Sequence, residues 1–447
     1  MSRLPRSVVG DAYASTNARE FLADLVDVRN RMAGQEGEAA GAAVVVDALE
    51  AAGARDVGTD EFDIDGWWRG DAAVETSGAH EDRYDLSHEV IALPGTPAGT
   101  GAGDLVDVGY GRPEDFEAAD LDGKVAMASS ETPSDYGRWI HRMEKYVGAV
   151  DAGAEAFVFR NHIEGSLPPT GEVGYDNRPG PIPAVGVSKE LGARLRRHAE
   201  DDVAVAVEVD CRNEPATSRN VSGDLGPDTD EVVLVTAHHD SHDIAEGAND
   251  NGAGCALVVE VARLLAQVEE DLDTRVRCMT FGSEEIGLQG AAHAASVLDL
   301  DDVRCVLNAD GAGRARRLSV GTNASPALES LFTGVAEDLA VPLSTDDVVT
   351  PHGDQWAFVQ EGVPGVMVSS TNPDKSGRGW GHTHADTLDK VDVRDLRAHA
   401  AFLAETAVRA AEAGAEFGHR SREDVRDLID EGYEKELRMG GRWPYDD

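Results

Sequence analysis

The sequence predicts an α/β fold with a mixed sheet, parallel at its centre and sandwiched by helices, that carries an inserted β-rich module. After residue 230, short apolar runs alternate with longer segments of helical spacing, which is typical of βαβ units. Residues 87–210 instead carry short apolar runs between Gly- and Pro-rich turns. A chain of 447 residues has room for two or three domains.

The first elements are two helices within 17–52, separated at "MAGQEG" and stopped by Gly53, followed by a strand at 56–64. Helices are expected near 138–153 and 189–199 inside the module. The main domain then comprises 1–86 and 211–415, the inserted module 87–210, and a charged C-terminal extension 416–447, helical around 423–437.

The second half alternates strands and helices. "EVVLVTA" is a near-continuous apolar run, which indicates a strand buried on both faces. A helix at 254–268 and the strands "RVRCMTF", "VRCVLNA", "RLSVG" and "PGVMVSS" follow, with later helices at 326–339 and 393–414. These alternating elements form the mostly parallel centre of the sheet.

The composition is strongly acidic. The 84 acids outnumber 40 bases for a net charge of −44, and the bases are 34 Arg and six Lys. Acids spread along the whole chain would repel one another unless salt screens them, so we expect a halophilic protein. We expect no nucleic-acid partner, since phosphate binding needs clustered bases.

The N-terminal residues lack an apolar signal core, and no run of about 18 apolar residues occurs. We therefore expect a cytoplasmic protein with no membrane partner. The four cysteines have no CxxC spacing and are expected to be small buried side chains. The oligomeric state stays open.

Polar clusters follow the predicted strands at their carboxyl ends: "HHDSHD", "GSEE", "ADGAG" and "GWGHTHADTLDKVD". Ligands bind at this edge of open α/β sheets. Histidine and carboxylate are zinc ligands, and a two-metal site needs one bridging carboxylate and a general base that is not a ligand. The adjacent Glu284 and Glu285 can divide these roles because neighbouring side chains diverge. In an extended strand His238 and Asp240 share a face, whereas His239 turns away.

The ordered motifs "AHHDS", "GANDNGAG", "GSEEIGLQGA", "NADG" and "HTHADTLDKVD" resemble the co-catalytic dizinc peptidases, a family that includes zinc aminopeptidases, plasma glutamate carboxypeptidase-like enzymes and the transferrin receptor. "DLDGKVAMAS", "AGAEAFVF" and "IPAVGVSKELGARL" resemble a protease-associated domain. The resemblance extends from about residue 15 to 415 and implies a zinc-exopeptidase-like fold that acts on peptide substrates.

The resemblance implies two Zn²⁺ per chain, with Co²⁺ or Mn²⁺ as possible substitutes, and five metal ligands: His238, Asp250, Glu285, Asp310 and His382. His238 and Asp310 would bind the first ion, Glu285 and His382 the second, and Asp250 would bridge them. Glu284 would be the general base, Asp240 would orient His238, and Asp386 would support His382. His239 and His242 are expected in packing or at the surface, and Asp243 and Glu246 as loop charges.

The chain departs from the family at two positions, with Gly381 where many aminopeptidases carry Tyr and His384 where Pro is common. His384 is therefore an alternative ligand. An aminopeptidase is the preferred activity. A carboxypeptidase or dipeptidase is the alternative, since Arg314, Arg316, Arg317 and Arg378 could bind a terminal carboxylate. A glutaminyl-cyclase-like acyltransferase with one zinc and a non-catalytic receptor-like binding protein also stay open at this point.

Overall fold

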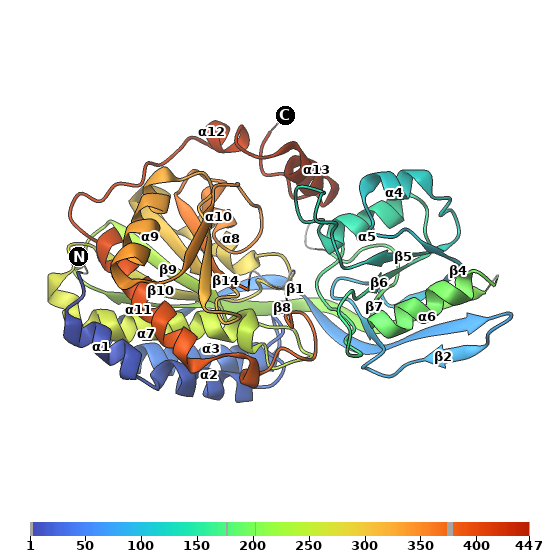
Figure 1. The fold of residues 1–447 in the computed structure, drawn as a ribbon, viewed down its shortest axis with the longest axis horizontal. Helices are drawn as coiled ribbons and strands as arrows, with labels where there is room; N and C mark the ends of the chain where they lie inside the picture. Colours follow the sequence, from blue (N-terminus) through green and yellow to red (C-terminus); the bar gives the residue numbers. More distant parts are fainter. Residues whose placement is uncertain (1–2, 176–177, 202, 373–378, 447) are drawn as a thin grey trace.

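The computed structural model describes residues 3–175, 178–201, 203–372 and 379–446. Its strands form one continuous 14-stranded sheet with the order β13-β12-β14-β11-β9-β10-β8-β4-β5-β6-β7-β3, to which β1 and β2 attach beside β8. Helices cover both faces of the half that contains β9, as Figure 1 shows. The α/β class, the mixed sheet and its helical layers are thus confirmed.

The helices of the main domain are α1 (Arg6–Ala14), α2 (Asn17–Asp27), α3 (Glu36–Ala52), α7 (Ala253–Leu265), α8 (Gln289–Val297), α9 (Pro326–Leu339), α10 (Trp356–Val359) and α11 (Val393–Ala410). Its strands are β9 (Val232–His238), β10 (Arg275–Phe281), β11 (Val303–Ala309), β12 (Arg317–Gly321), β13 (Leu343–Asp346) and β14 (Gly365–Thr371). β9 pairs in parallel with both β10 and β11, and β11 pairs in parallel with β14, so three neighbouring interfaces at the centre are parallel.

The position of β9 in the fold explains why its sequence is a continuous apolar run. Val233 and Val235 belong to the core beneath α7 and α11, whereas Val232 and Leu234 belong to a second core beneath α8 and α10. Successive side chains of a strand point to opposite faces, so a strand covered on both faces must be apolar at every position. The stretch Ala248–Asp271 is long and apolar enough to cross a membrane, but 83% of its apolar window is buried, as in a core helix.

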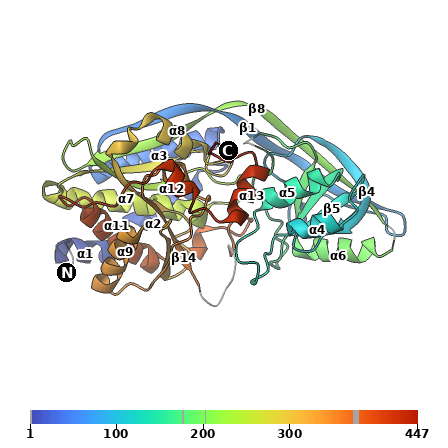
Figure 2. The ribbon, with the colours of Figure 1, turned by 90° about the horizontal axis from the view of Figure 1, so that it is seen from above.

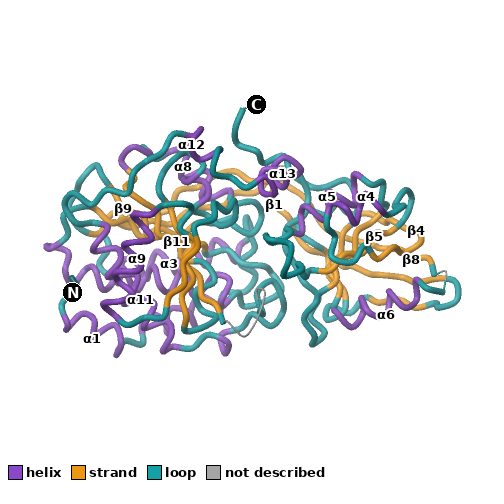
Figure 3. The backbone as a smooth tube through the Cα atoms, turned by 45° about the horizontal axis from the view of Figure 1, so that its top comes forward, coloured by secondary structure: helices purple, strands orange, loops and turns teal. Residues whose placement is uncertain are grey.

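The inserted module contains β3 (Val90–Ala92), β4 (Gly99–Asp107), β5 (Val125–Ser129), β6 (Ala156–Arg160) and β7 (Ala184–Val187), with α4 (Pro113–Ala118), α5 (Arg142–Asp151) and α6 (Lys189–Ala199). Figure 3 shows α4 and α5 on one side of these strands and α6 on the other. Helices therefore cover both faces of the module. Helix α4 was not expected, since six residues are too short to show a helical period.

The module is not separate from the main sheet. β1 (Arg55–Ser77) and β8 (Ala204–Leu225) pair antiparallel over most of their length, and β2 (Asp82–Tyr84) pairs with β1. Figure 2 shows β1 and β8 running together from one half of the molecule into the other. The predicted strand at 56–64 is therefore only the first part of β1, and the predicted domain boundaries stay a prediction, because both strands serve both halves.

The C-terminal extension crosses from the main domain to the module. It contains two helices, α12 (Arg422–Arg426) and α13 (Glu431–Met439), where the sequence predicted one. The Asp430 side chain accepts a hydrogen bond from the Gly432 backbone and so begins a second helix. Glu436 on α13 is buried and forms an ion pair with Arg138 of the module, and Figure 1 shows α13 beside α5.

Candidate metal centre

The candidate site lies where the parallel strands of the main domain end. His238 is the last residue of β9, Glu284 and Glu285 follow β10, and Asp310 follows β11. His382 lies in the loop after β14. The structure thus brings all five candidate ligands to one edge of the sheet, as the strand-end clusters led us to expect.

The candidate ligands form two groups of ligand atoms within 4.8 Å of one another, His238 with Asp250 and Asp310, and Glu285 with His382 and His242. Asp250 lies between them. Its Oδ1 is 3.5 Å from His238 Nε2, and its Oδ2 is 3.5 Å from His382 Nε2. A carboxylate that turns one oxygen to each group is placed to bridge two metal ions.

Each candidate ligand histidine presents Nε2 to its group because an oxygen lies at Nδ1. His238 Nδ1 is 3.2 Å from the Asp240 carbonyl oxygen and 3.3 Å from its Oδ1. His382 Nδ1 is 3.1 Å from the carbonyl oxygen of Thr170, in the inserted module. An acceptor at Nδ1 fixes the tautomer that leaves Nε2 available to a metal.

Asp240 connects the two strand ends. Besides contacting His238, its Oδ1 accepts a hydrogen bond from Glu284 N at 3.1 Å, and its Oδ2 accepts one from Glu285 N at 3.2 Å. The fully buried Asp240 carboxylate therefore positions one candidate ligand of each group and the candidate general base at once.

The two adjacent glutamates have opposite electrostatic surroundings. Burial, together with the charges of Glu285 and Asp310, raises the pKa of Glu284 well above its ordinary value, although His238 opposes this. Burial would also raise the pKa of Glu285, but His242 and His382 hold it well below the ordinary value. The surroundings thus favour the charged form of Glu285 and the protonated form of Glu284, the direction of division that a ligand and a general base need.

Two supporting roles differ from the prediction. Asp386 does not support His382. Its two oxygens accept hydrogen bonds from the backbone N–H groups of Asn249 and Asp250, each at 2.9 Å, and so hold the loop that presents Asp250. His384 has its ring nitrogens 3.0 and 2.9 Å from the carbonyl oxygens of Ile244 and Ser87, away from both groups.

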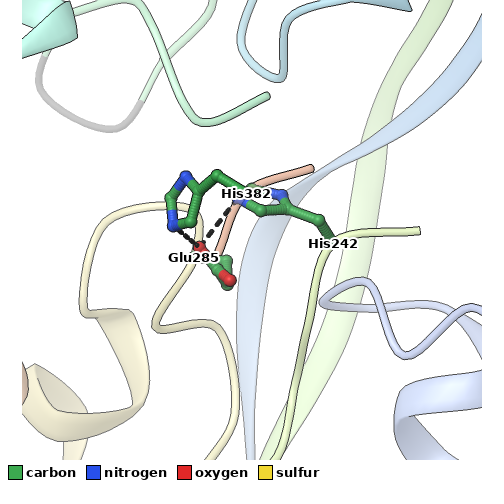
Figure 4. Close-up of side chains that lie close together, drawn as sticks. All are labelled: His242, Glu285 and His382. Atoms are coloured by element: carbon green, nitrogen blue, oxygen red, sulfur yellow. Dashed lines mark ion pairs between the residues drawn. The ribbon is translucent and has the colours of Figure 1, made fainter. Parts of the chain in front are cut away.

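Several residues that follow β9 also make more contacts around the candidate site than the sequence predicted. His239 is a packing residue, with Nδ1 3.0 Å from Thr280 Oγ1. His242, expected in packing or at the surface, is buried beside Glu285 and His382 (Figure 4). Asp243 forms a largely buried ion pair with Arg69, and Glu246 accepts a hydrogen bond from the Leu388 backbone, so neither is a solvated loop charge.

Sequence reasoning also missed Asp354, which precedes α10. It is fully buried, and the charges of His238, Asp240 and Asp310 act on its carboxyl group. Burial raises its pKa well above the ordinary value. Among 84 acids an isolated Asp after a Gly carried no signal that could single it out.

A cavity of about 960 Å³ opens beside His382. The main domain contributes Gly381 and Thr383 to its wall, and the inserted module contributes Glu131, Asp135 and Trp139, among others. The module therefore forms a large part of the space through which a substrate would reach the candidate ligands.

Comparison with known proteins identifies both parts of the chain. Residues 220–407 match peptidase family M28, and residues 91–195 match the PA domain. Aminopeptidase YwaD of Bacillus subtilis is 28% identical over 66% of this chain, which spans 63% of the length of that protein. Leucine aminopeptidase 2 of Trichophyton rubrum is 27% identical over 79% of this chain and 71% of its own.

Solved structures agree with this fold over both halves. A peptidase M28 precursor from Shewanella amazonensis is 25% identical and matches with a TM-score of 0.77 over 92% of this chain and 97% of its own. BSAP, a zinc aminopeptidase from Bacillus subtilis, is 25% identical with a TM-score of 0.70, over 93% of this chain and 98% of its own. The predicted resemblance to this peptidase family with an inserted PA domain is confirmed.

Proposed function

We propose that this chain, a peptidase family M28 protein with an inserted PA domain, is a two-zinc aminopeptidase that removes N-terminal residues from peptides. The observation that carries the proposal is the Asp250 carboxylate, which directs one oxygen to each of two histidine- and carboxylate-containing groups. The donor set of imidazole nitrogen and carboxylate oxygen suits zinc. His238, Asp250 and Asp310 would hold one ion, and Asp250, Glu285 and His382 the other.

When bound, the two ions would supply Lewis acidity and lower the pKa of the attacking water. Glu284 is placed to take up a proton from the attacking water and to pass it to the leaving amine. Its Oε2 is 3.9 Å from His238 Nε2, so the carboxyl lies beside the first group without belonging to either. The Asp240 carboxylate holds Glu284 in place by accepting a hydrogen bond from the Glu284 backbone N–H. The PA domain narrows access to the site.

The surroundings of the cavity favour a free N-terminus over a free C-terminus. Of the three cavity arginines, Arg138 is paired with the Glu144 and Glu436 carboxylates and Arg142 with the Glu172 carbonyl, whereas Arg112 has a looser partner in Glu114, at 3.9 Å. A terminal carboxylate would need an uncommitted guanidinium. The carboxylates of Glu131 and Asp135 instead line the cavity, where they attract an α-ammonium group.

Two arginines of the predicted cluster after Asp310, Arg316 and Arg317, are poorly placed to bind a terminal carboxylate, whereas Arg314 lies beside Gly311, next to Asp310. Arg316 contacts the Arg394 carbonyl and Asp395 at the surface, and Arg317 is exposed. Arg378 lies outside the described residues. The relatives named above are aminopeptidases, which supports the same choice.

Two further parts of the proposal concern the surroundings of the protein. A net charge of −44 supports activity at high salt, where screening weakens the repulsion between surface carboxylates. A cytoplasmic location stays a prediction.

The test is an assay at high salt with zinc or cobalt, using amino-acid p-nitroanilides and N-blocked dipeptides as substrates. An aminopeptidase cleaves the p-nitroanilides and leaves the blocked dipeptides intact. Cleavage of the blocked substrates alone would make the chain a carboxypeptidase. Zinc analysis of the same sample should give about two ions per chain, whereas one ion indicates a cyclase-like enzyme and none a binding protein.

A further inference from the structure

His242 lies against the second group of candidate ligands. Its Nε2 is 2.8 Å from Glu285 Oε2, and His382 Nε2 is 3.2 Å from that same oxygen. The two imidazole rings meet edge to face with their centres 4.5 Å apart. Figure 4 shows both histidines directed toward the Glu285 carboxylate from different segments of the chain.

The contact between His242 Nε2 and Glu285 is a close ion pair rather than a well-directed hydrogen bond. Both ring nitrogens of His242 are buried and make no hydrogen bond in the described part of the chain, although Nε2 is so close to the carboxylate. By contrast, His384 and His399 each have carbonyl oxygens near both ring nitrogens. A buried ring without hydrogen bonds is unfavourable unless something else binds its nitrogen.

The space between these side chains suits a single ion. A cavity of about 10 Å³ is lined by His242, Asp250, Glu285 and His382, together with neighbouring loop residues. This volume is on the order of one water molecule by the same measure. An imidazole nitrogen aimed at a small, carboxylate-lined cavity matches the chemistry of a zinc ligand rather than that of a packing residue.

We infer that His242 is an additional ligand of the second metal ion, beside Asp250, Glu285 and His382. The inference rests on the proposed two-metal site. It gives the second ion four protein ligands, whereas His238, Asp250 and Asp310 give the first ion three. Zinc can expand to five donors, so four protein ligands hold an ion more firmly than three and still leave a position for water. The second ion is therefore held more tightly than the first.

The first test measures zinc retention. Wild type, His242→Gln and His384→Gln, each loaded with two zinc ions, are dialysed against increasing concentrations of a chelator, and the zinc left per chain is counted. We expect the wild type to lose its ions in two separate steps. In His242→Gln the second step moves to at least about 10-fold lower chelator concentration, approaching the first. His384→Gln, the matched control, keeps both steps.

The second test detects the ligand directly. His242→Cys replaces imidazole with a thiol that binds metal as thiolate. When loaded with cobalt, this variant should show a thiolate-to-cobalt charge-transfer band in the near ultraviolet that the cobalt-loaded wild type lacks, because the four native cysteines are buried as free thiols. The band requires only that the variant folds and binds cobalt, so it remains informative if His242→Gln is unstable.

The outcomes separate this inference from the proposed function. A wild type that binds fewer than two ions contradicts the proposed function itself. A wild type with two ions, a His242→Gln variant with unchanged zinc retention and a His242→Cys variant without the band overturn the role of His242 alone. If His242→Gln keeps both ions but loses kcat, the side chain acts on the substrate and is not a ligand.

Discussion

Replacement of Asp240 by Asn tests how much of the activity depends on a residue that touches no metal. The side chain is fully buried and has three neighbours, the Glu284 N–H at 3.1 Å, the Glu285 N–H at 3.2 Å and His238 Nδ1 at 3.3 Å. Asn has nearly the same shape, but it carries no charge and has a single acceptor oxygen. One of the two backbone N–H groups must therefore face an NH₂ group.

The size of the effect follows from these contacts. Leaving one buried donor without an acceptor costs about 1–3 kcal/mol, a factor of roughly 5–150 in an equilibrium or rate constant. Substitutions of this kind behind a metal ligand typically cost about 10–100-fold in activity or metal affinity. We expect Asp240→Asn to lower kcat/KM by about 10–100-fold, since Glu284 and His238 lose their common support.

The assay is hydrolysis of an amino-acid p-nitroanilide at high salt in a zinc buffer that keeps both variants fully loaded. Asp63→Asn is the control, because Asp63 is an exposed Asp on β1, and its replacement should leave kcat/KM unchanged. A fully loaded Asp240→Asn enzyme with kcat/KM within about twofold of wild type would refute the reasoning, as the hydrogen bonds would then not maintain the site.

Three further predictions concern other parts of the molecule. Glu284→Gln should lower kcat by about 10²–10⁴-fold, the usual contribution of a general base, while zinc per chain stays unchanged; a fall in zinc content would instead make Glu284 a ligand. Burial lowers the pKa of Lys145 to about 7, whereas a lysine in an unfolded chain has a pKa of about 10.4. Between these two pH values the unfolded state binds more protons than the folded state, so the free energy of unfolding rises with pH. Urea midpoints at about pH 7 and pH 9 should therefore differ in the wild type, with a smaller difference in Lys145→Met, and equal differences in both would exclude Lys145 as the cause. Glu436→Ala removes one of the two carboxylates paired with the buried Arg138, which keeps Glu144, and should cost about 1–3 kcal/mol in denaturant unfolding. The exposed Glu434→Ala on the same helix should cost about 0.3–0.5 kcal/mol, and equal losses would mean that the buried pair does not hold α13 against the module.

The parts predictable from sequence are those that depend on short-range periodicity. The apolar run of β9 required helices on both faces, and the alternation of side chains separated His238 from His239. Clusters at the ends of parallel strands meet by topology, so the convergence of the candidate ligands needed no knowledge of any contact.

The parts not predictable depend on pairing or on backbone atoms. β1 continues through Gly66 and past an irregularity at Gly70 because β8 supplies partners on both sides, and this long-range pairing overrides the local preference against glycine. The sequence feature that could have indicated His242 is its position four residues after His238. The alternation of side chains could not place it, because alternation applies only to an extended chain and the loop after β9 is not extended. Thr170 contributes backbone groups to His382, and a carbonyl has no sequence signature.

The contact between Thr170 and His382 changes the role assigned to the inserted module. Thr170 donates its N–H to the His382 carbonyl at 2.9 Å, and its own carbonyl oxygen lies 3.1 Å from His382 Nδ1. His382 has a φ of 58°, in the left-handed region that non-glycine residues rarely adopt, so its conformation depends on outside support. Arg69 binds Thr170 Oγ1 and pairs with Asp243, which ties the same loop to the β9 side of the site. The module therefore orients a candidate ligand of the second ion as well as lining the substrate cavity. Because both Thr170 bonds use backbone atoms, side-chain substitutions at this position leave them in place, and loosening the module as a whole would weaken metal retention together with substrate binding.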